Sequence, residues 1–135
     1  MYWSCEGSLS RVDSDGRVVL FATERTGYRD LHATDRSLCW ASGNGWILGG
    51  RPDGRVSPLA RDQISPVVTC DSELAFWSNC PGWDPIRPTI VRASVDGSRP
   101  TVLHSSEDLP DRIFVTESAI GWHDDRTGDI RVLAK

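Results

Sequence analysis

Short apolar runs, separated by turn residues, follow one another along the whole chain. Runs such as LSRV, RVVLF, TIVRASV and PTVLH are brief and rich in β-branched residues, a composition that favours β-strands. No segment of ten or more residues combines a helical spacing of apolar positions with helix caps. The pattern therefore predicts an all-β chain made of many short strands.

Four tryptophans mark an internal repeat. Trp3, Trp40 and Trp77 are spaced by 37 residues, and Trp122 follows 45 residues after Trp77. Downstream of each of the first three, an apolar residue is followed six positions later by an Asp-Gly pair. Asp-Gly between extended runs is a strong hairpin signal, for which positive φ is expected at both central residues. The predicted hairpin pairs are Asp15 with Gly16, Asp53 with Gly54, and Asp96 with Gly97.

Each repeat is interpreted as four strands, labelled a to d. Strand a is an apolar segment that ends in an acid, strand b holds the tryptophan, strand c precedes the Asp-Gly pair, and strand d follows it. Four short strands in a unit of about 40 residues are typical of a β-propeller blade. The tryptophans would be the recurring core residues that pack one blade on the next, each burying about 150–250 Å².

The repeat begins and ends part-way through a unit. In strand order the chain reads b-c-d, a-b-c-d, a-b-c-d, a-b-c, which is fourteen strands or about three and a half blades. The expected architecture is one all-β domain of four-stranded antiparallel blades in an incomplete ring. Because open ends expose strand edges and an apolar face, we expect the remaining blades or a second chain to close it, and favour the remaining blades. The predicted blades are about 1–24, 28–61, 64–105 and, incomplete, 111–135.

The tryptophan motifs resemble a known family. YWSC and FWSN, with CWAS and GWHD as weaker copies, are followed by LSRVDSDG and IVRASVDG, and together they resemble the YWTD-type six-bladed β-propeller repeat and the related bacterial TolB-like repeats. The resemblance implies a secreted, periplasmic or cell-surface propeller that binds protein or peptide and carries no catalytic residues. The fourth motif position holds Cys5, Ser42, Asn79 and Asp124, so only the last repeat has the family's acid.

The loops divide between two faces. Because strand direction alternates, the short a–b and c–d turns share one face, and the longer, more variable b–c and d–a loops share the other. Binding residues tend to lie on such loops. The longest, SNCPGWDPIRP, places Trp83 outside the repeat register, where it either contacts a partner or covers its own blade. The predicted binding face consists of Tyr28, Trp83, Asp84 and Arg87.

Charge and hydropathy exclude two classes of partner. The net charge is −4, and the arginines are scattered rather than clustered, so no nucleic-acid surface is expected. No run approaches the roughly 18–20 apolar residues of a membrane span, and the N-terminus lacks a signal-peptide pattern. An extracytoplasmic location is therefore implied by the family resemblance alone.

Neither a metal nor a cofactor is expected. The segment HDDRTGD holds His123, Asp124, Asp125 and Asp129, but the acids are adjacent and no distal Glu follows, unlike a calcium loop. A polar turn is the preferred interpretation. No G-x-G-x-x-G or phosphate-binding loop occurs.

The four cysteines leave their state open. Cys5, Cys39, Cys70 and Cys80 form no CxxC pair, and none has a histidine at zinc-ligand spacing. They are expected to be small buried apolar residues. One or two disulfides remain an alternative for an exported protein, with three possible full pairings.

The predicted function is that of a non-catalytic scaffold which presents its b–c and d–a loops to a protein, peptide or envelope component. No G-x-S-x-G elbow is present, and the histidines lie in different repeats. One alternative is part of a six-bladed propeller enzyme, such as a metal-dependent lactonase or esterase, and another is a sensor domain of a longer protein. The enzyme would rely on inward-pointing acids of the a strands, namely Asp30, Asp35, Asp71 and Glu117.

Overall fold

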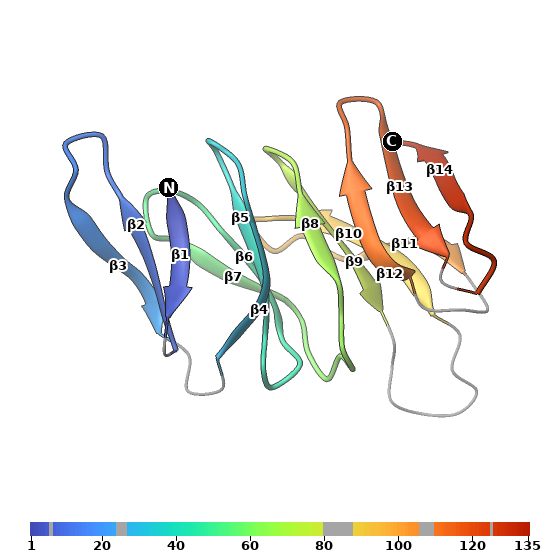
Figure 1. Cartoon of the computed structure of the whole chain (residues 1–135), viewed down its shortest axis with the longest axis horizontal. Helices are drawn as coiled ribbons and strands as arrows, with labels where there is room; N and C mark the ends of the chain where they lie inside the picture. The colour runs from blue at the N-terminus through green and yellow to red at the C-terminus, as the bar shows by residue number, and fades with distance from the viewer. Residues whose placement is uncertain (6, 24–26, 80–87, 106–109, 125) are drawn as a thin grey trace.

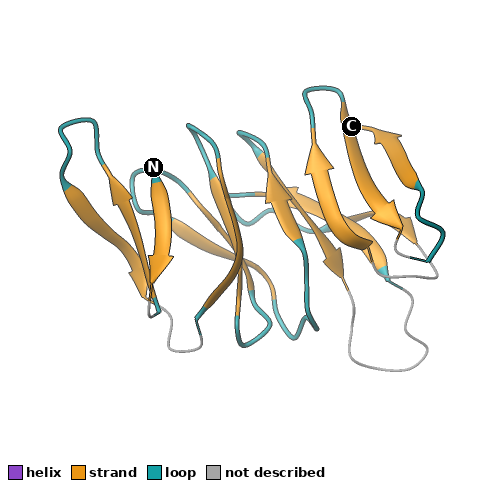
Figure 2. Cartoon of the chain, viewed as in Figure 1, coloured by secondary structure: helices purple, strands orange, loops and turns teal. Residues whose placement is uncertain are grey.

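The computed structural model describes residues 1–5, 7–23, 27–79, 88–105, 110–124 and 126–135, with backbone only for 3–5 and 20–23. Strands and loops alone are seen in these ranges (Figure 2), which confirms the all-β prediction. Accordingly, the described ranges contain no helix of the length and apolarity needed to span a membrane.

Within the described residues, fourteen strands form four antiparallel sheets that stand side by side in chain order (Figure 1). Consecutive strands pair within each sheet, and the described strands do not close into a barrel. The first sheet contains β1 (Tyr2–Cys5), β2 (Ser8–Val12) and β3 (Val18–Thr23). The second contains β4 (Tyr28–Ala33), β5 (Leu38–Ser42), β6 (Ile47–Gly50) and β7 (Val56–Ala60). The third contains β8 (Val68–Cys70), β9 (Leu74–Asn79), β10 (Thr89–Ser94) and β11 (Thr101–Ser105), and the fourth contains β12 (Pro110–Val115), β13 (Ala119–Asp124) and β14 (Ile130–Ala134).

The strand order b-c-d, a-b-c-d, a-b-c-d, a-b-c is present as expected, so the sheets have the form of blades in an incomplete array. Strands β4, β8 and β12 are the a strands and form one edge of their sheets. They neighbour one another, β4 beside β8 and β8 beside β12. The assignment of the chain to one domain with the stated blade limits stays a prediction.

The sheets pack face to face because side chains alternate along each strand. On β5, Trp40 joins an apolar cluster with Leu9 of the first sheet, whereas its neighbour Cys39 joins the cluster shared with the third sheet. Trp77 of β9 lies in the cluster shared with the second sheet, and Trp122 of β13 lies in the cluster shared with the third. Each of these tryptophans therefore faces the sheet that precedes its own.

The Asp-Gly pairs lie in loops between strands, but with a different conformation from the expected one. Only the glycine has positive φ, 80° at Gly16 and 94° at Gly54 and Gly97. In the first loop the Gly16 amide donates to the Asp13 carbonyl, and the Asp13 amide donates to the Arg17 carbonyl, each at 3.0 Å. This is a three-residue loop in which a type I turn precedes one left-handed residue. The expectation of two positive φ values is wrong because this loop needs only one, which glycine supplies without steric cost.

Candidate functional site

The edge strands β4 and β8 meet through side chains rather than through a backbone ladder. Strand β8 uses one edge to pair with β9, which leaves the amides of Val68 and Cys70 pointing away from its own sheet. The Val68 amide donates to Asp30 Oδ2 at 2.5 Å, and the Cys70 amide donates to His32 Nδ1 at 3.3 Å. Alternate residues of β4 therefore satisfy alternate amides of β8, which would otherwise be costly to bury.

A bulge in β4 gives Asp30 this position. The pairing of β4 with β5 shifts register between Arg29 and His32, and Asp30 has a φ of 50°. A β-bulge changes the direction of a side chain, and bulges are common next to functional sites. Asp also tolerates a left-handed backbone conformation better than most residues do. Burial is the main cause that raises the pKa of Asp30, and the hydrogen bond from Val68 opposes it.

A histidine and two cysteines gather beside this contact. His32 and Cys39 are cross-strand partners in the second sheet, and Cys70 comes from the third. Their ligand atoms all lie within 4.8 Å of one another, with Cys70 Sγ at 3.7 Å from His32 Nδ1. Both cysteines are buried free thiols, whereas the histidine is partly exposed. The Ser37 hydroxyl lies 3.7 Å from Cys70 Sγ and also contacts the carbonyl of Asp71.

Contacts within this cluster shift the pKa values of its two thiols in opposite directions. A hydrogen bond with the Cys39 thiol lowers the pKa of Cys70 to about 6, helped by His32 and Ser37 and opposed by burial. Burial raises the pKa of Cys39 well above its ordinary value, and the hydrogen bond to Cys70 acts in the same direction. The contact with Cys70 also raises the pKa of His32. These contacts thus favour ionisation of the Cys70 thiol over ionisation of the Cys39 thiol.

Two pockets lie along the a strands, and His32 borders both. The first, of about 400 Å³, opens where these strands begin and is lined by residues that include Asp30, Asp111 and Arg112. The second, of about 670 Å³, lies where the a strands end. Its polar lining includes Cys70 together with Asp35, Asp71, Glu117 and Lys135.

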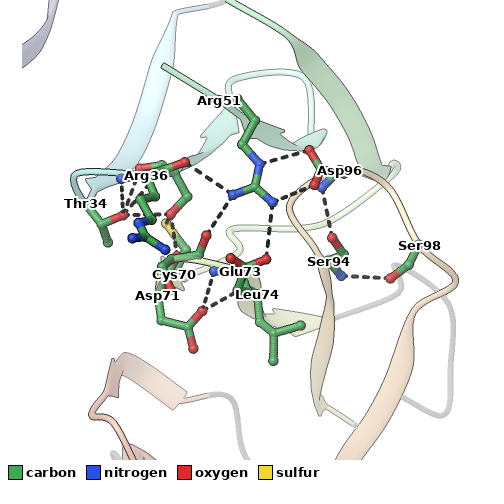
Figure 3. A network of polar contacts seen from close by, with 12 residues as sticks. Thr34, Arg36, Arg51, Cys70, Asp71, Glu73, Leu74, Ser94, Asp96 and Ser98 are labelled. Atoms are coloured by element: carbon green, nitrogen blue, oxygen red, sulfur yellow. Dashed lines mark hydrogen bonds and ion pairs between the residues drawn. The ribbon is translucent and has the colours of Figure 1, made fainter. Parts of the chain in front are cut away.

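Arg51 ties the second sheet to turns of the third (Figure 3). Its Nε donates to Asp96 Oδ1 at 3.0 Å, and its Nη1 donates to the Ser72 carbonyl at 2.8 Å. Its Nη2 also lies 3.5 Å from Glu73 Oε2. The contact with Arg51 lowers the pKa of Asp96. Asp96, which the sequence assigns only to a hairpin turn, therefore also joins two sheets.

Of the predicted binding face, only Tyr28 falls within the described residues; Trp83, Asp84 and Arg87 lie outside them. Tyr28 begins β4 and is half-buried. Its ring meets that of Trp40 edge-on, with the centroids 6.2 Å apart. Tyr28 thus packs between the first two sheets as well as bordering the loop face.

The repeated tryptophans that are described are buried, with exposed fractions of 0% for Trp40, 1% for Trp77 and 3% for Trp122. The side chain of Trp3 lies outside the described residues. In the HDDRTG segment, Asp124 Oδ1 accepts the amide of Arg126 at 3.2 Å, within its own turn.

Sequence reasoning did not bring His32, Cys39 and Cys70 together. Their spacing matches no zinc motif because the three residues meet across two sheets rather than along one loop. Aligning the repeats on the tryptophans would have placed Cys39 and Cys70 on facing sides of neighbouring sheets. The side chains of Cys5 and Cys80 lie outside the described residues.

Comparison with solved structures identifies the architecture. A chain in the crystal structure of a nidogen/laminin complex is similar with a TM-score of 0.67 and 19% identity, over 99% of this chain and 60% of that one. The chain has a β-propeller-like fold. Two computationally designed proteins resemble this propeller at 10% identity: Ika4, with a TM-score of 0.71 over 96% of this chain and 80% of that one, and Ika8, with 0.70 over 99% and 42%. No family model and no curated protein matches the chain.

Proposed function

We propose that this propeller segment is a binding scaffold that holds a protein or peptide partner on the face formed by its b–c and d–a loops. The observation that carries the proposal is the pocket of about 400 Å³ where the a strands of three sheets begin. Asp30 from the second sheet, Val67 before the third and Arg112 from the fourth border it. A concave site at the meeting point of rigid strands, under variable loops, suits recognition.

An aromatic and a basic side chain on the same face support this role. Trp46, in the loop between β5 and β6, is half-buried, and the guanidinium of Arg61, just after β7, lies 5.1 Å from its ring centroid. Trp and Arg are enriched among the residues that dominate binding energy. Trp83, Asp84 and Arg87 belong to the segment between strands b and c of the third sheet, outside the described residues, and stay predicted contacts of this face.

The repeat type and setting extend this proposal. We take the repeats to be of the six-bladed YWTD or TolB-like type, in an extracytoplasmic protein, with further blades or a second chain completing the ring. The nidogen/laminin structure supports a protein partner, because the similar chain there was crystallised as a complex. The present chain spans 60% of the length of that similar chain. The identity of its own partner therefore stays part of the proposal.

A non-catalytic role is preferred to a metal-dependent hydrolase because the four acids named for that alternative do not all line one pocket, and two of them are already engaged in other contacts. Asp30 lines one pocket, while Asp35, Asp71 and Glu117 line the other. Asp30 already accepts the Val68 amide, and Asp71 accepts two amides of its own turn and contacts Lys135.

The test is selection of displayed peptides against the purified chain, followed by affinity measurement on matched charge reversals. Arg112→Glu alters the loop-face pocket, and Arg99→Glu alters an exposed arginine on the turn face. We expect Arg112→Glu and Trp46→Ala to weaken selected peptides by about tenfold or more, as hot-spot losses do, with Arg99→Glu unchanged. The proposal would be overturned if peptide affinity is unchanged by both Arg112→Glu and Trp46→Ala, or if it falls only with Arg99→Glu.

A further inference from the structure

We propose that His32, Cys39 and Cys70 form a zinc site that joins the second and third sheets. All three ligand atoms lie within 4.8 Å of one another. Around a tetrahedral zinc, with Zn–S near 2.3 Å and Zn–N near 2.0–2.1 Å, ligand atoms are about 3.5–3.8 Å apart. The separation of 3.7 Å between Cys70 Sγ and His32 Nδ1 already falls in this range.

The donor set suits zinc rather than a hard cation. Two sulfurs and one imidazole are ligands of the kind that zinc prefers, whereas magnesium and calcium take oxygen. Cys39 and Cys70 are 0% and 1% exposed, so their sulfurs sit in a sheltered position between the sheets. The ring of His32 borders both pockets along the a strands and gives an ion a route from solvent.

The orientation of the histidine fits the same role. His32 Nδ1 accepts the Cys70 amide at 3.3 Å when the ring is neutral and carries its proton on Nε2. In that tautomer Nδ1 is unprotonated, and zinc would take its single lone pair in place of the Cys70 amide, so metal binding would exchange this hydrogen bond for a coordination bond. The fourth position falls to solvent or to the hydroxyl of Ser37, which lies 3.7 Å from Cys70 Sγ.

The interface between the third and fourth sheets shows which residues occupy the equivalent positions where the described residues form no metal-binding set. Cys39 and Phe76 each precede a repeated tryptophan, and their cross-strand partners are His32 and Thr69. The pair His32 and Cys39 on the second sheet thus corresponds to Thr69 and Phe76 on the third. A threonine and a phenylalanine offer no comparable set of ligands.

The residue that faces this pair from the neighbouring sheet also differs between the two interfaces. Cys70 pairs with Ala75 and Val115 pairs with Ile120, and both partners lie two residues before a tryptophan. Cys70 therefore corresponds to Val115, which packs in the apolar cluster between the third and fourth sheets. The third–fourth interface therefore has Thr69, Phe76 and Val115 at these positions, and the second–third interface has three metal-binding side chains.

The experiment measures zinc bound to the full chain after loading under reducing conditions and dialysis against metal-free buffer. We expect about one zinc per chain, as three N and S ligands plus solvent would hold. Cobalt in place of zinc should give the thiolate charge-transfer and visible absorption of a tetrahedral site. Loss of a residue that only supports a metal ligand weakens metal affinity about 10–100-fold. His32→Ala, Cys39→Ser and Cys70→Ser each remove a direct ligand, so each should lower zinc affinity by at least that factor.

Two variants keep the test decisive. Cys5→Ser with Cys80→Ser removes the other two cysteines and should leave zinc content and cobalt spectrum unchanged. Cys70→Val inserts the residue of the next repeat; it should melt cooperatively, bind no zinc, and lose the zinc-induced rise in melting temperature seen in the unaltered chain. The proposal is overturned if zinc content follows Cys5 and Cys80 instead, if the cobalt spectrum lacks thiolate bands, or if Cys39 and Cys70 are found joined as a disulfide under the same conditions.

Discussion

The interface between the second and third sheets and the interface between the third and fourth use the same repeat positions with different chemistry. Each buries one tryptophan, Trp77 in the first case and Trp122 in the second. In the second–third interface, side chains of β4 accept the outward amides of Val68 and Cys70. The equivalent amides in β12 have no such acceptor among the described residues. A repeated apolar pattern therefore builds both interfaces, and a few side chains decide whether polar contacts join the neighbouring backbones.

The largest effect should come from removing a shared apolar anchor. Trp77→Ala deletes a side chain that is 1% exposed and should lower the free energy of unfolding by about 3–5 kcal/mol. Trp122→Ala, at 3% exposure, should cost a similar amount, because apolar packing is common to both interfaces. Urea unfolding of the two variants checks this. A cost below about 1 kcal/mol for either one would contradict the packing described.

Gly49 should reveal how closely the second and third sheets approach. A Cβ at Gly49 would lie 2.3 Å from the Val95 carbonyl oxygen, which is backbone and cannot move aside easily. Gly49→Ala should therefore destabilise the chain by about 1–3 kcal/mol, as overpacking does.

The matched change is Gly121→Ala in the fourth sheet. There the new Cβ would meet the ring of Phe114, which is 42% exposed and can turn toward solvent. Thermal unfolding should rank Gly49→Ala as the more harmful of the two. The reverse order would show that the second and third sheets lie farther apart at this point.

Arg51 should make the second–third interface sensitive to acid. Arg51→Met removes hydrogen bonds to Asp96 and to the Ser72 carbonyl and should cost about 1–3 kcal/mol at neutral pH. Because the pKa of Asp96 is held below its ordinary value of 3.8, this pairing stabilises the fold fully above that value. It is lost as pH falls through the lower, folded-state pKa.

The difference in stability between the unaltered chain and Arg51→Met should therefore be constant above about pH 5 and shrink below about pH 4. Denaturant titrations across this range measure it. Ser94→Ala is the control, since Ser94 holds the corresponding place before the third Asp-Gly pair and, among the described residues, its hydroxyl accepts the nearby Asp96 amide and contacts no arginine. A difference that stays constant into strong acid would exclude the Asp96 pairing as its source.

The smallest effect concerns the third–fourth interface. Lys135 contacts the Asp71 carboxylate and donates to the Thr116 carbonyl at 3.0 Å. Lys135→Ala should cost about 0.5–1 kcal/mol, at the upper end of the range for ion pairs near the surface, and less at high salt. Melting temperatures at two salt concentrations check this. A salt-independent loss would point to packing over Phe76, whose ring lies 5.8 Å from the ammonium, instead of charge.

Much of the fold was readable from the sequence because local signals repeat. Short β-branched runs, tryptophans at regular spacing and Asp-Gly pairs marked the strands and turns, and the order of fourteen strands follows from them. The conformation of the Asp-Gly loops was not readable, because one dipeptide serves loops of two lengths that differ in the number of left-handed residues.

The site was less predictable because its members meet across sheets. Cys39 and Cys70 are far apart in the chain, and their approach depends on which face of each strand turns toward the neighbour. The same limit applies to Arg51 and Asp96, whose contact joins two separate turns. The binding-face residues Trp83, Asp84 and Arg87 remain predictions from loop length and register alone.

The most direct test of the contrast between the two interfaces is amide hydrogen exchange at four equivalent positions, measured by NMR. Val68 and Cys70 lie outside the ladder of their own sheet yet donate to Asp30 and His32, so their amides should exchange slowly. The corresponding amides of Ile113 and Val115 in β12 should exchange faster. Similar rates at all four positions, or faster exchange at Val68 and Cys70, would contradict the side-chain bridge between β4 and β8.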